Sequence, residues 1–456
     1  MRYSALPSFN APSAHFRSLL MGALLGSFIA NIGSPLAAPL SYDDARTTLH
    51  SVSDLKQSSE ANANRREYEA RAADSLHLPE VFVNATQVYG VKTGTLTTPL
   101  GGIDFSQNFA GPRSSINSTW QIYEGGRITA TQRALDAGAN AARAELTVTN
   151  EEIDVDLARV YFGLELAANI ERTRASILQQ ADRQLNRAIR FEQQGLIPKV
   201  ERLNAQVSRD EADRELVRAQ ADRRIAEARL QRLLRRDTAV EPATPLFVIT
   251  SPLKPLTQWL ATAENNNPTL AAFDARREQA KQGIVIAESR WKPTIFAFGS
   301  YSFIKHYQTL IEPNWIAGIG INFTLFSRED RANTVSAARE TLKQVDSLEK
   351  ETRNNIDTGV ETAYQKVAQA REQFQLLEST LALARENLRL RERGFDEGQA
   401  TSLDVNDARN ALARAETARA LAAYEFVVSL AQLLEASGRA NTLSEYIQQA
   451  DVQLRP

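Results

Sequence analysis

The chain contains an internal duplication. Residues near 53–235 and 267–437 show one order of expected elements: helix, strand, loop, strand, very long helix, tight turn and returning helix. A shift of the first copy by 203 positions brings a series of landmark residues into coincidence. The matching positions are Trp120 and Phe323, Tyr123 and Phe326, Tyr161 and Tyr364, Leu185 and Leu388, Arg190 and Arg393, Gly195 and Gly398, and Ala205 and Ala408. A fixed offset maintained over such a distance is typical of a repeat architecture.

Each copy contains a helix far longer than the helices of compact domains. No proline occurs in residues 126–194 or 328–393, and strong helix formers dominate both stretches. A helix of about 70 residues is roughly 100 Å long, whereas helices of globular proteins average about 11–12 residues. We therefore expect the long helices to pack side by side as a coiled coil. Leucines at heptad or half-heptad spacing fit this packing: Leu377, Leu381, Leu388 and Leu390.

Turns rich in glycine and proline divide the chain into parts. Tight turns at residues 195–198 and 398–402 end the long helices, and a proline-rich segment between the copies is expected to be a linker against the side of the bundle. The predicted organisation is a signal peptide (1–38), a first repeat (39–235), a linker (236–256), a second repeat (257–437) and a polar C-terminal tail (438–456).

Two segments in each copy alternate with the period of a β-strand: residues 81–89 and 115–123, joined by a Gly/Thr/Pro-rich loop, and residues 294–303 and 314–325. Apolar residues share one face of the second strand of each pair: Ile116, Trp120 and Ile122, and then Trp315, Ala317, Ile319, Ile321, Phe323 and Leu325. A strand between lipid and a watery lumen has this pattern, and so does a soluble sandwich strand with one buried face.

The N-terminus has the features of a secretory signal peptide. Arg2 and Arg17 are followed by an apolar stretch within residues 19–32, and Leu36-Ala37-Ala38 resembles a cleavage site. The alternative is a membrane anchor, but the apolar stretch is shorter than the ~20 residues that span a bilayer. We favour cleavage and export.

The composition excludes several classes of function. The net charge is −2, from 53 basic and 55 acidic residues, so no basic surface for nucleic acid is expected. The chain has no cysteine, which excludes disulfides, thiol catalysis and a lipidated N-terminal cysteine. Its four histidines are far apart in the sequence, and neither a metal site nor another cofactor is predicted.

Four strands cannot close a barrel, and lipid does not tolerate an open sheet edge. The chain must therefore assemble with copies of itself if its strands span a membrane. Three copies give twelve strands, whereas two give eight, a barrel filled by its own side chains. We favour the trimer, and a dimer stays open. The polar helices must then lie in an aqueous compartment.

The fold class is α+β and mostly α, a coiled-coil helical barrel joined to a four-strand share of a transmembrane β-barrel.

Several motifs resemble the TolC-like outer-membrane efflux and secretion channels. Residues 120–127, an aromatic strand end followed by Gly-Gly-Arg, resemble the family's strand-to-helix junction. Residues 267–270 resemble the Asn-Pro opening of its helices, and residues 395–408 resemble its periplasmic hairpin turn. The match covers about residues 41–437. The resemblance implies a homotrimer in the outer membrane of a Gram-negative bacterium, with a periplasmic tunnel that docks on an adaptor protein and an inner-membrane pump.

The resemblance also implies a gate at the closed tunnel tip. Asp404 and Asp407 match the family's acidic rings, Glu201 matches a carboxylate in the first copy, and Phe395 stands where well-studied members have a gating tyrosine. Three copies of each carboxylate around an axis would favour cations. The alternative is local, with Ser402 capping the helix and Asp404 in its first turn. The tip residues expected to meet the adaptor are Gly195, Leu196, Gly398 and Ala400.

The sequence departs from the family at some of these positions. Phe395 lacks a hydroxyl, and Ala400 replaces the family's tip arginine, so a latch from that residue is absent and closure is expected to depend more on packing. Lys199, Arg202 and Arg409 are nearby cations. The first copy has Ser53-Asp54 where the second has Asn-Pro, and its strand loop is 11 residues longer.

The sequence is compatible with two functions of different classes. The first is passive conduction in efflux or type I secretion, and the second is a non-conducting coiled-coil scaffold of the cell envelope. A scaffold has no need for two lipid-patterned strand pairs at matched positions. An enzyme is not predicted, because no nucleophile elbow, phosphate loop or metal constellation occurs and the pair Asp404 and Asp407 is weak evidence for acid catalysis.

Overall fold

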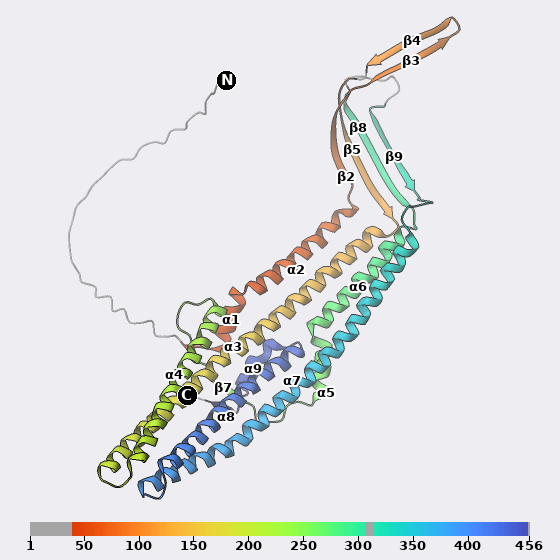
Figure 1. The fold of residues 1–456 in the computed structure, drawn as a ribbon. Helices are drawn as coiled ribbons and strands as arrows, with labels where there is room; N and C mark the ends of the chain where they lie inside the picture. The colour runs from red at the N-terminus through yellow and green to blue at the C-terminus, as the bar shows by residue number, and fades with distance from the viewer. Residues whose placement is uncertain (1–38, 109, 306–312, 455–456) are drawn as a thin grey trace, which may run out of the picture. The chain divides into compact units, whose positions relative to one another are not determined.

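The computed structural model describes residues 39–108, 110–305 and 313–454, so the predicted signal peptide lies outside the described residues. The first repeat comprises α1 (Tyr42–Val52), α2 (Asp54–Ala73), a 3₁₀ turn (Asp74–His77), β2 (Glu80–Val88), β3 (Val91–Thr98), β4 (Gly101–Asn108), β5 (Gly111–Glu124), α3 (Arg127–Gln193) and α4 (Lys199–Leu234). The second comprises α5 (Leu256–Asn266), α6 (Pro268–Ser289), β8 (Thr294–Lys305), β9 (Trp315–Asn322), α7 (Arg331–Asp396) and α8 (Ser402–Ala436) (Figure 1).

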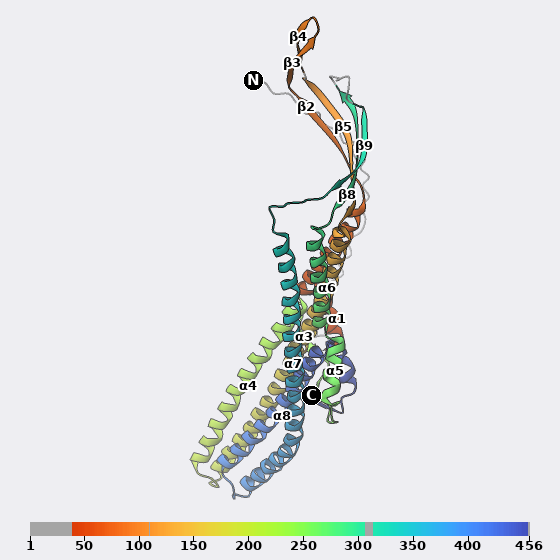
Figure 2. The same ribbon diagram turned by 90° about the vertical axis from the view of Figure 1, so that its right-hand side faces the viewer.

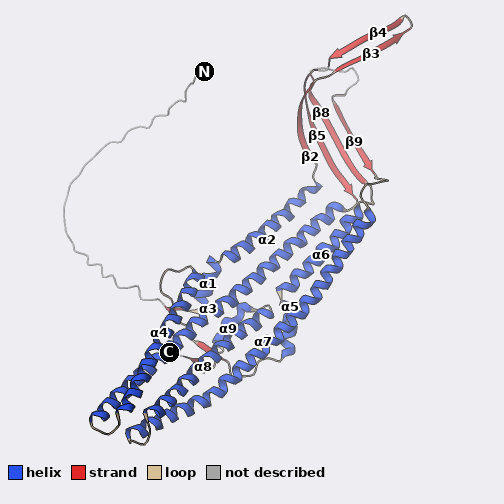
Figure 3. Cartoon of the chain, viewed as in Figure 1, coloured by secondary structure: helices blue, strands red, loops and turns tan. Residues whose placement is uncertain are grey.

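The strands from the two repeats form one antiparallel sheet in the order β2-β5-β8-β9. The helices that adjoin these strands in the sequence pack in the corresponding order, with α2 on α3, α3 on α6 and α6 on α7. Figure 3 shows how the chain alternates between strand and helix at these junctions. Both edges of the sheet, β2 and β9, lack a strand partner among the described residues.

The longer connection in the first repeat is an additional hairpin and not the loop that the sequence predicts. Strands β3 and β4 pair in an antiparallel register from Val91 with Asn108 to Thr98 with Gly101. Threonines dominate β3, so the apolar alternation that signals a strand is weak, and the glycines at 101 and 102 favoured the prediction of a loop. The 11 extra residues of this copy therefore lie in a connection that forms an ordered two-stranded ribbon.

Two further boundaries differ from the prediction. Strand β9 ends at Asn322, so Phe323 and Leu325 do not continue its apolar face. The single helix expected before the first strand is broken at Ser53, whose hydroxyl accepts the amide hydrogen of Lys56 and caps α2. Asn267 has the same function between α5 and α6, where its side chain accepts from Thr269. Serine and asparagine are both strong N-cap residues, so the missing Asn-Pro pair leaves the local structure intact.

The long helices pack as a coiled coil (Figure 2). Buried α7 residues recur every seven positions: Val360, Val367, Phe374, Leu381, Leu388 and Phe395. Leu390, which we expected on this face, is exposed instead and forms a second stripe with Leu376 and Leu383, again at intervals of seven. A helix with two apolar stripes needs a packing partner for each, and the other helix of its own hairpin covers only one of them.

Residues 236–256 contribute to the main core. Short strand β7 (Leu246–Val248) is fully buried and pairs with β10 (Val452–Leu454) from the C-terminal tail, while β6 (Glu241–Pro242) pairs with β1 (Pro39–Leu40). Phe247 packs its ring against Phe162 of α3 and Phe426 of α8. The tail also includes a 3₁₀ turn (Ala440–Thr442) and α9 (Leu443–Gln448). The segment between the repeats thus holds together helices from both of them.

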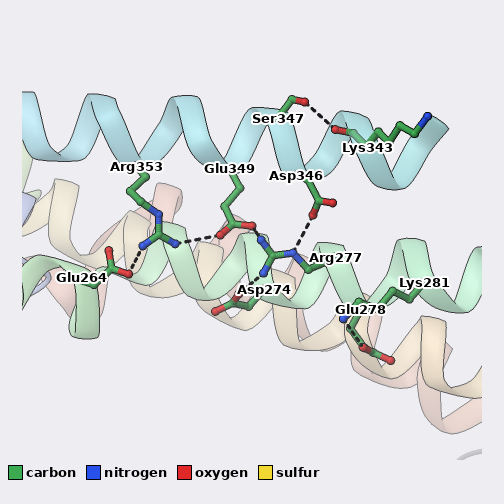
Figure 4. A network of polar contacts seen from close by, with 10 residues as sticks. All are labelled: Glu264, Asp274, Arg277, Glu278, Lys281, Lys343, Asp346, Ser347, Glu349 and Arg353. Carbon is green, nitrogen blue, oxygen red and sulfur yellow. Dashed lines mark hydrogen bonds and ion pairs between the residues drawn. The ribbon is translucent and has the colours of Figure 1, made fainter. Parts of the chain in front are cut away.

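A polar network joins the helices of the second repeat (Figure 4). Arg277 of α6 donates to Asp346 of α7 at 2.9 Å and also pairs with the buried Glu349. Arg353 donates to Glu349 at 3.0 Å and pairs with Glu264 of α5. Two guanidinium groups therefore neutralise a buried carboxylate that would be costly if it were unpaired.

Among the described residues, none of the helices combines the length and the apolar character that a membrane-spanning helix requires.

Candidate functional site

The two helical hairpins end in turns of the same type. Gly195 and Gly398 adopt left-handed conformations, with φ of 71° and 73°. The amide of Leu196 donates to the carbonyl of Phe191, and that of Gln399 donates to Gly394, which closes a six-residue hydrogen-bonded turn in each hairpin. This is the Schellman arrangement, in which glycine follows the helix because it alone adopts the left-handed conformation without steric cost.

The returning helix of the second hairpin begins with a capping box. The Thr401 hydroxyl accepts the amide hydrogen of Asp404, and the Asp404 carboxylate accepts that of Thr401 at 2.9 Å. The prediction that Ser402 caps this helix is wrong by one residue, because Ser402 is already inside the helix and its hydroxyl is buried without a partner among the described residues. These bonds from Thr401, with Arg391 at 3.6 Å, lower the pKa of Asp404.

The first hairpin begins its returning helix differently. Pro198 is the N-cap residue and offers no side-chain acceptor. Glu201, three residues further on, directs its carboxylate to the other hairpin, where it accepts the backbone amide hydrogen of Ser402 at 2.8 Å. Arg202 joins the start of α4 to the end of α3, through an ion pair with Glu192 at 2.6 Å. Glu201 therefore links the two tips.

Aromatic packing joins the hairpins at Phe395. Its side chain is only 2% exposed and stacks on Phe191 with ring centroids 5.9 Å apart. The surrounding cluster takes residues from α3, α4, α7 and α8: Ala188, Ala205, Leu381, Leu388, Val405, Ala408, Leu412 and Ala415. Phe395 thus lies in an apolar environment. The hydroxyl of the family's tyrosine would be buried here and would need a hydrogen-bond partner.

An ion pair that the sequence did not reveal also joins the hairpins. Arg187 of α3 donates to Asp396 of α7 at 3.1 Å and lies 3.9 Å from Glu392. Arg187 and Asp396 are 209 residues apart. Asp396 lies within the hairpin-turn motif, but Arg187 belongs to no motif, so nothing in the sequence indicated their pairing. Of the cations that we considered near the tip, Arg202 stays within its own hairpin, whereas Arg409 is buried.

The remaining predicted residues lie on the surface of the tips. Asp407 is exposed one helical turn after Asp404, so the two carboxylates share a face of α8. Leu196 is 66% exposed, and a side chain added at Gly195 or Gly398 would meet only open space. Ala400 is half-buried against the cluster around Phe395.

The described residues contain no group of three or more His, Asp or Glu side chains placed to hold a metal ion. Nε2 of His50 lies 2.7 Å from a carboxylate oxygen of Asp154, and His77 lies 3.1 Å from Gln132. The chemistry available at the tips is therefore that of carboxylates, guanidinium groups and packing.

The sequence profile of the outer membrane efflux protein family matches residues 46–235 and 259–439, one stretch in each repeat and together most of the chain. The chain belongs to this family. It is thus a channel-type protein of the Gram-negative outer membrane with a large periplasmic helical part, and it is not an enzyme.

Individual relatives of this outer membrane efflux protein are distant in sequence. Protein CyaE of Bordetella pertussis is 24% identical over 269 residues, which cover 56% of each chain. The match therefore spans about half the length of that relative.

Solved structures show the same fold. CusC has a TM-score of 0.74 at 14% identity, covering 87% of this chain and 92% of its own. VceC of Vibrio cholerae has a TM-score of 0.72 at 16% identity, covering 87% and 96%. The open state of the MtrE outer membrane channel of Neisseria gonorrhoeae has 0.70 at 18%, covering 88% and 89%.

Proposed function

We propose that this protein is the outer-membrane component of a tripartite efflux or type I secretion system. In this proposal it acts as a homotrimer and conducts substrate passively from an inner-membrane pump and a periplasmic adaptor across the outer membrane. The cargo is set by the pump. The observation that carries the proposal is the four-stranded antiparallel sheet with two open edges, continued by helices in the same lateral order.

The order of strands supports ring closure by copies of the chain. Because every pairing in β2-β5-β8-β9 is antiparallel, β2 and β9 run in opposite directions. The β9 edge of one protomer therefore pairs with the β2 edge of the next as an antiparallel ladder, and three copies close a barrel of twelve strands. The outward-facing residues of these strands contact lipid.

The helices offer a matching lateral interface. Helix α7 follows β9, and its exposed stripe consists of Leu376, Leu383 and Leu390. Helix α4 belongs to the repeat that contains β2 and exposes Val200, Leu203, Val207 and Val217. A protomer with different apolar surfaces on its two flanks forms a heterologous contact that closes as a ring.

The tips form the gate in this proposal. Asp404 and Asp407 of three protomers place six carboxylates around the axis, which attract cations and repel anions. The contacts of Glu201, Arg187 and Phe395 hold the two hairpins of each protomer together and keep the tip closed. Residues 195–196 and 398–400 are the surface on which the adaptor docks, and docking separates the hairpins.

Ion selectivity in a planar bilayer tests the proposal. The wild-type protein is expected to give small, cation-selective currents, measured by the reversal potential across a salt gradient. The double variant Asp404→Asn/Asp407→Asn keeps the shapes of both side chains and is expected to lose most of the selectivity. Asp222→Asn, an exposed site on α4, is the matched control and leaves selectivity intact.

Two results would contradict this account in different ways. Selectivity that is unchanged in the double variant would place the constriction away from the tip. A folded protein that gives no current would favour the alternative, a non-conducting scaffold of the envelope.

A further inference from the structure

Arg409 of α8 is a buried guanidinium group without a counter-ion. Its residue is 2% exposed, and its Nε and Nη2 atoms are enclosed with no hydrogen-bond partner among the described residues. A buried charge that is neither paired nor hydrogen-bonded is one of the costliest features in a protein. No carboxylate of the described residues bonds these two atoms, so the charge of Arg409 is left without a direct partner.

The charges nearest to Arg409 do not balance it. Glu392 acts favourably on it, whereas Arg183 and Arg187 act unfavourably, and burial together with these arginines lowers the pKa of Arg409. Glu392 lies 3.9 Å from Arg187 and no ion pair joins it to Arg409. Glu392 is thus shared with Arg187 and does not serve as a counter-ion of Arg409 alone.

A second unpartnered polar group lies at the same level of the bundle. Gln184 of α3 is 2% exposed, and both polar atoms of its amide are enclosed without partners among the described residues. It lies between Ala181, which belongs to one apolar cluster, and Ala188, which belongs to the tip cluster. On α8, Arg409 lies between Ala408 and Ala413 of the same two clusters. Both unpartnered side chains therefore lie where the two apolar clusters adjoin.

Arg409 lines a cavity of about 260 Å³ between α3, α4 and α8. Its other cations are Arg174 and Arg414, and its neutral donors are Ser208, Asn406 and Asn410. Two carboxylates, Glu211 and Glu215, also line it, and Glu215 lies 3.7 Å from Arg174. Three guanidinium groups against two carboxylates leave one positive charge, and a water occupies only about 30 Å³.

We propose that this cavity binds a small oxyanion of the phosphate or sulfate type, with Arg409 as its central ligand. Water alone would satisfy hydrogen bonds but would leave the charge uncompensated. An oxyanion accepts hydrogen bonds from Arg409, from the cavity amides and from the Ser208 hydroxyl at once, and guanidinium groups match oxyanion geometry. Because the cavity is lined by both hairpins, the bound anion joins α3 and α4 to α8. This site does not depend on the proposed conduction.

Thermal unfolding of the full-length, detergent-purified protein in rising inorganic phosphate tests the site. Sodium chloride keeps the ionic strength constant. The wild type is expected to gain stability with a saturable dependence on phosphate, and Arg409→Gln is expected to weaken the apparent dissociation constant at least tenfold. Arg218→Gln, an exposed arginine on α4 outside the cavity, should behave as the wild type. Arg409→Gln is expected to fold, because it removes an uncompensated buried charge.

Crystals soaked in selenate provide the second measurement. Anomalous density in the cavity beside Arg409 is expected in the wild type and absent from Arg409→Gln. A phosphate effect that is linear, or that is equal in wild type and Arg409→Gln, would overturn the proposal. An empty cavity in selenate-soaked wild-type crystals would overturn it as well.

Discussion

The two hairpin tips occupy matching positions of the repeat, yet they use the same residue position for different purposes. Thr401 and Asp404 correspond to Pro198 and Glu201 at the offset of 203. In the second tip, Asp404 bonds the amide of its own N-cap residue. Proline has no amide hydrogen, so Glu201 has no such donor, and it bonds Ser402 of the other hairpin instead. A single loss of a backbone donor thus turns a local cap into a link between hairpins.

The largest difference between the tips is expected in their side-chain packing. Phe395→Ala removes a buried ring and is expected to lower the free energy of unfolding by about 3–5 kcal/mol. Leu196→Ala, in the exposed turn of the first tip, should change it by no more than about 0.5 kcal/mol. Hydrogen exchange of the tip amides in both variants measures this. Similar losses of protection would show that the tips do not differ in packing.

The Glu201 link can be diverted by restoring a capping box to the first tip. Pro198→Thr creates the pattern Thr-x-x-Glu, whose glutamate bonds its own N-cap amide. Glu201 then releases Ser402, and a hydrogen bond to a charged group contributes about 1.5–3 kcal/mol, so the Ser402 amide should exchange at least tenfold faster. Pro198→Ala restores the amide without the hydroxyl and should have a smaller effect. Unchanged exchange at Ser402 in Pro198→Thr would refute the explanation.

A smaller effect is expected from removing the existing cap. Thr401→Ala should destabilise the start of α8 by about 1 kcal/mol, while Thr401→Ser keeps the hydroxyl and should match the wild type. Hydrogen exchange over residues 402–406 reports the change. If the serine variant lost as much protection as the alanine variant, the hydroxyl would not be the stabilising group.

The smallest effect concerns pH at the second tip. The pKa of Asp404 is below its usual value, chiefly because of the Thr401 amide and hydroxyl. A carboxylate with a depressed folded pKa stabilises above its unfolded value of about 3.9 and loses this contribution as the pH falls through the folded value. The stability difference between wild type and Asp404→Asn should therefore shrink from pH 5 to pH 3. A stability difference that did not change with pH would contradict the assigned effect of the Thr401 hydrogen bonds on Asp404.

Local patterns predicted much of this architecture. Both long helices, their glycine turns and the four sheet strands follow from composition and period, because these signals extend over many residues. The β3-β4 hairpin was missed because threonines and glycines give no apolar alternation, and Thr401 was missed as the cap because Ser402 is an equally good candidate by type.

The contacts between the hairpins were not predictable from the sequence. Arg187 with Asp396, Glu201 with Ser402 and Phe191 with Phe395 each join residues about 200 positions apart, and their meeting depends on how two helices align. The burial of Arg409 is of the same kind, because it depends on which helices pack around α8.

The most direct test of the account is the single-channel conductance of Glu201→Ala beside the wild type, with Asp222→Ala on the same helix as the control. The account predicts larger or more frequent openings for Glu201→Ala alone, because the link to Ser402 helps to hold the hairpins closed. Conductance equal to that of the wild type and the control would contradict the claim that contacts between the two tips close the channel.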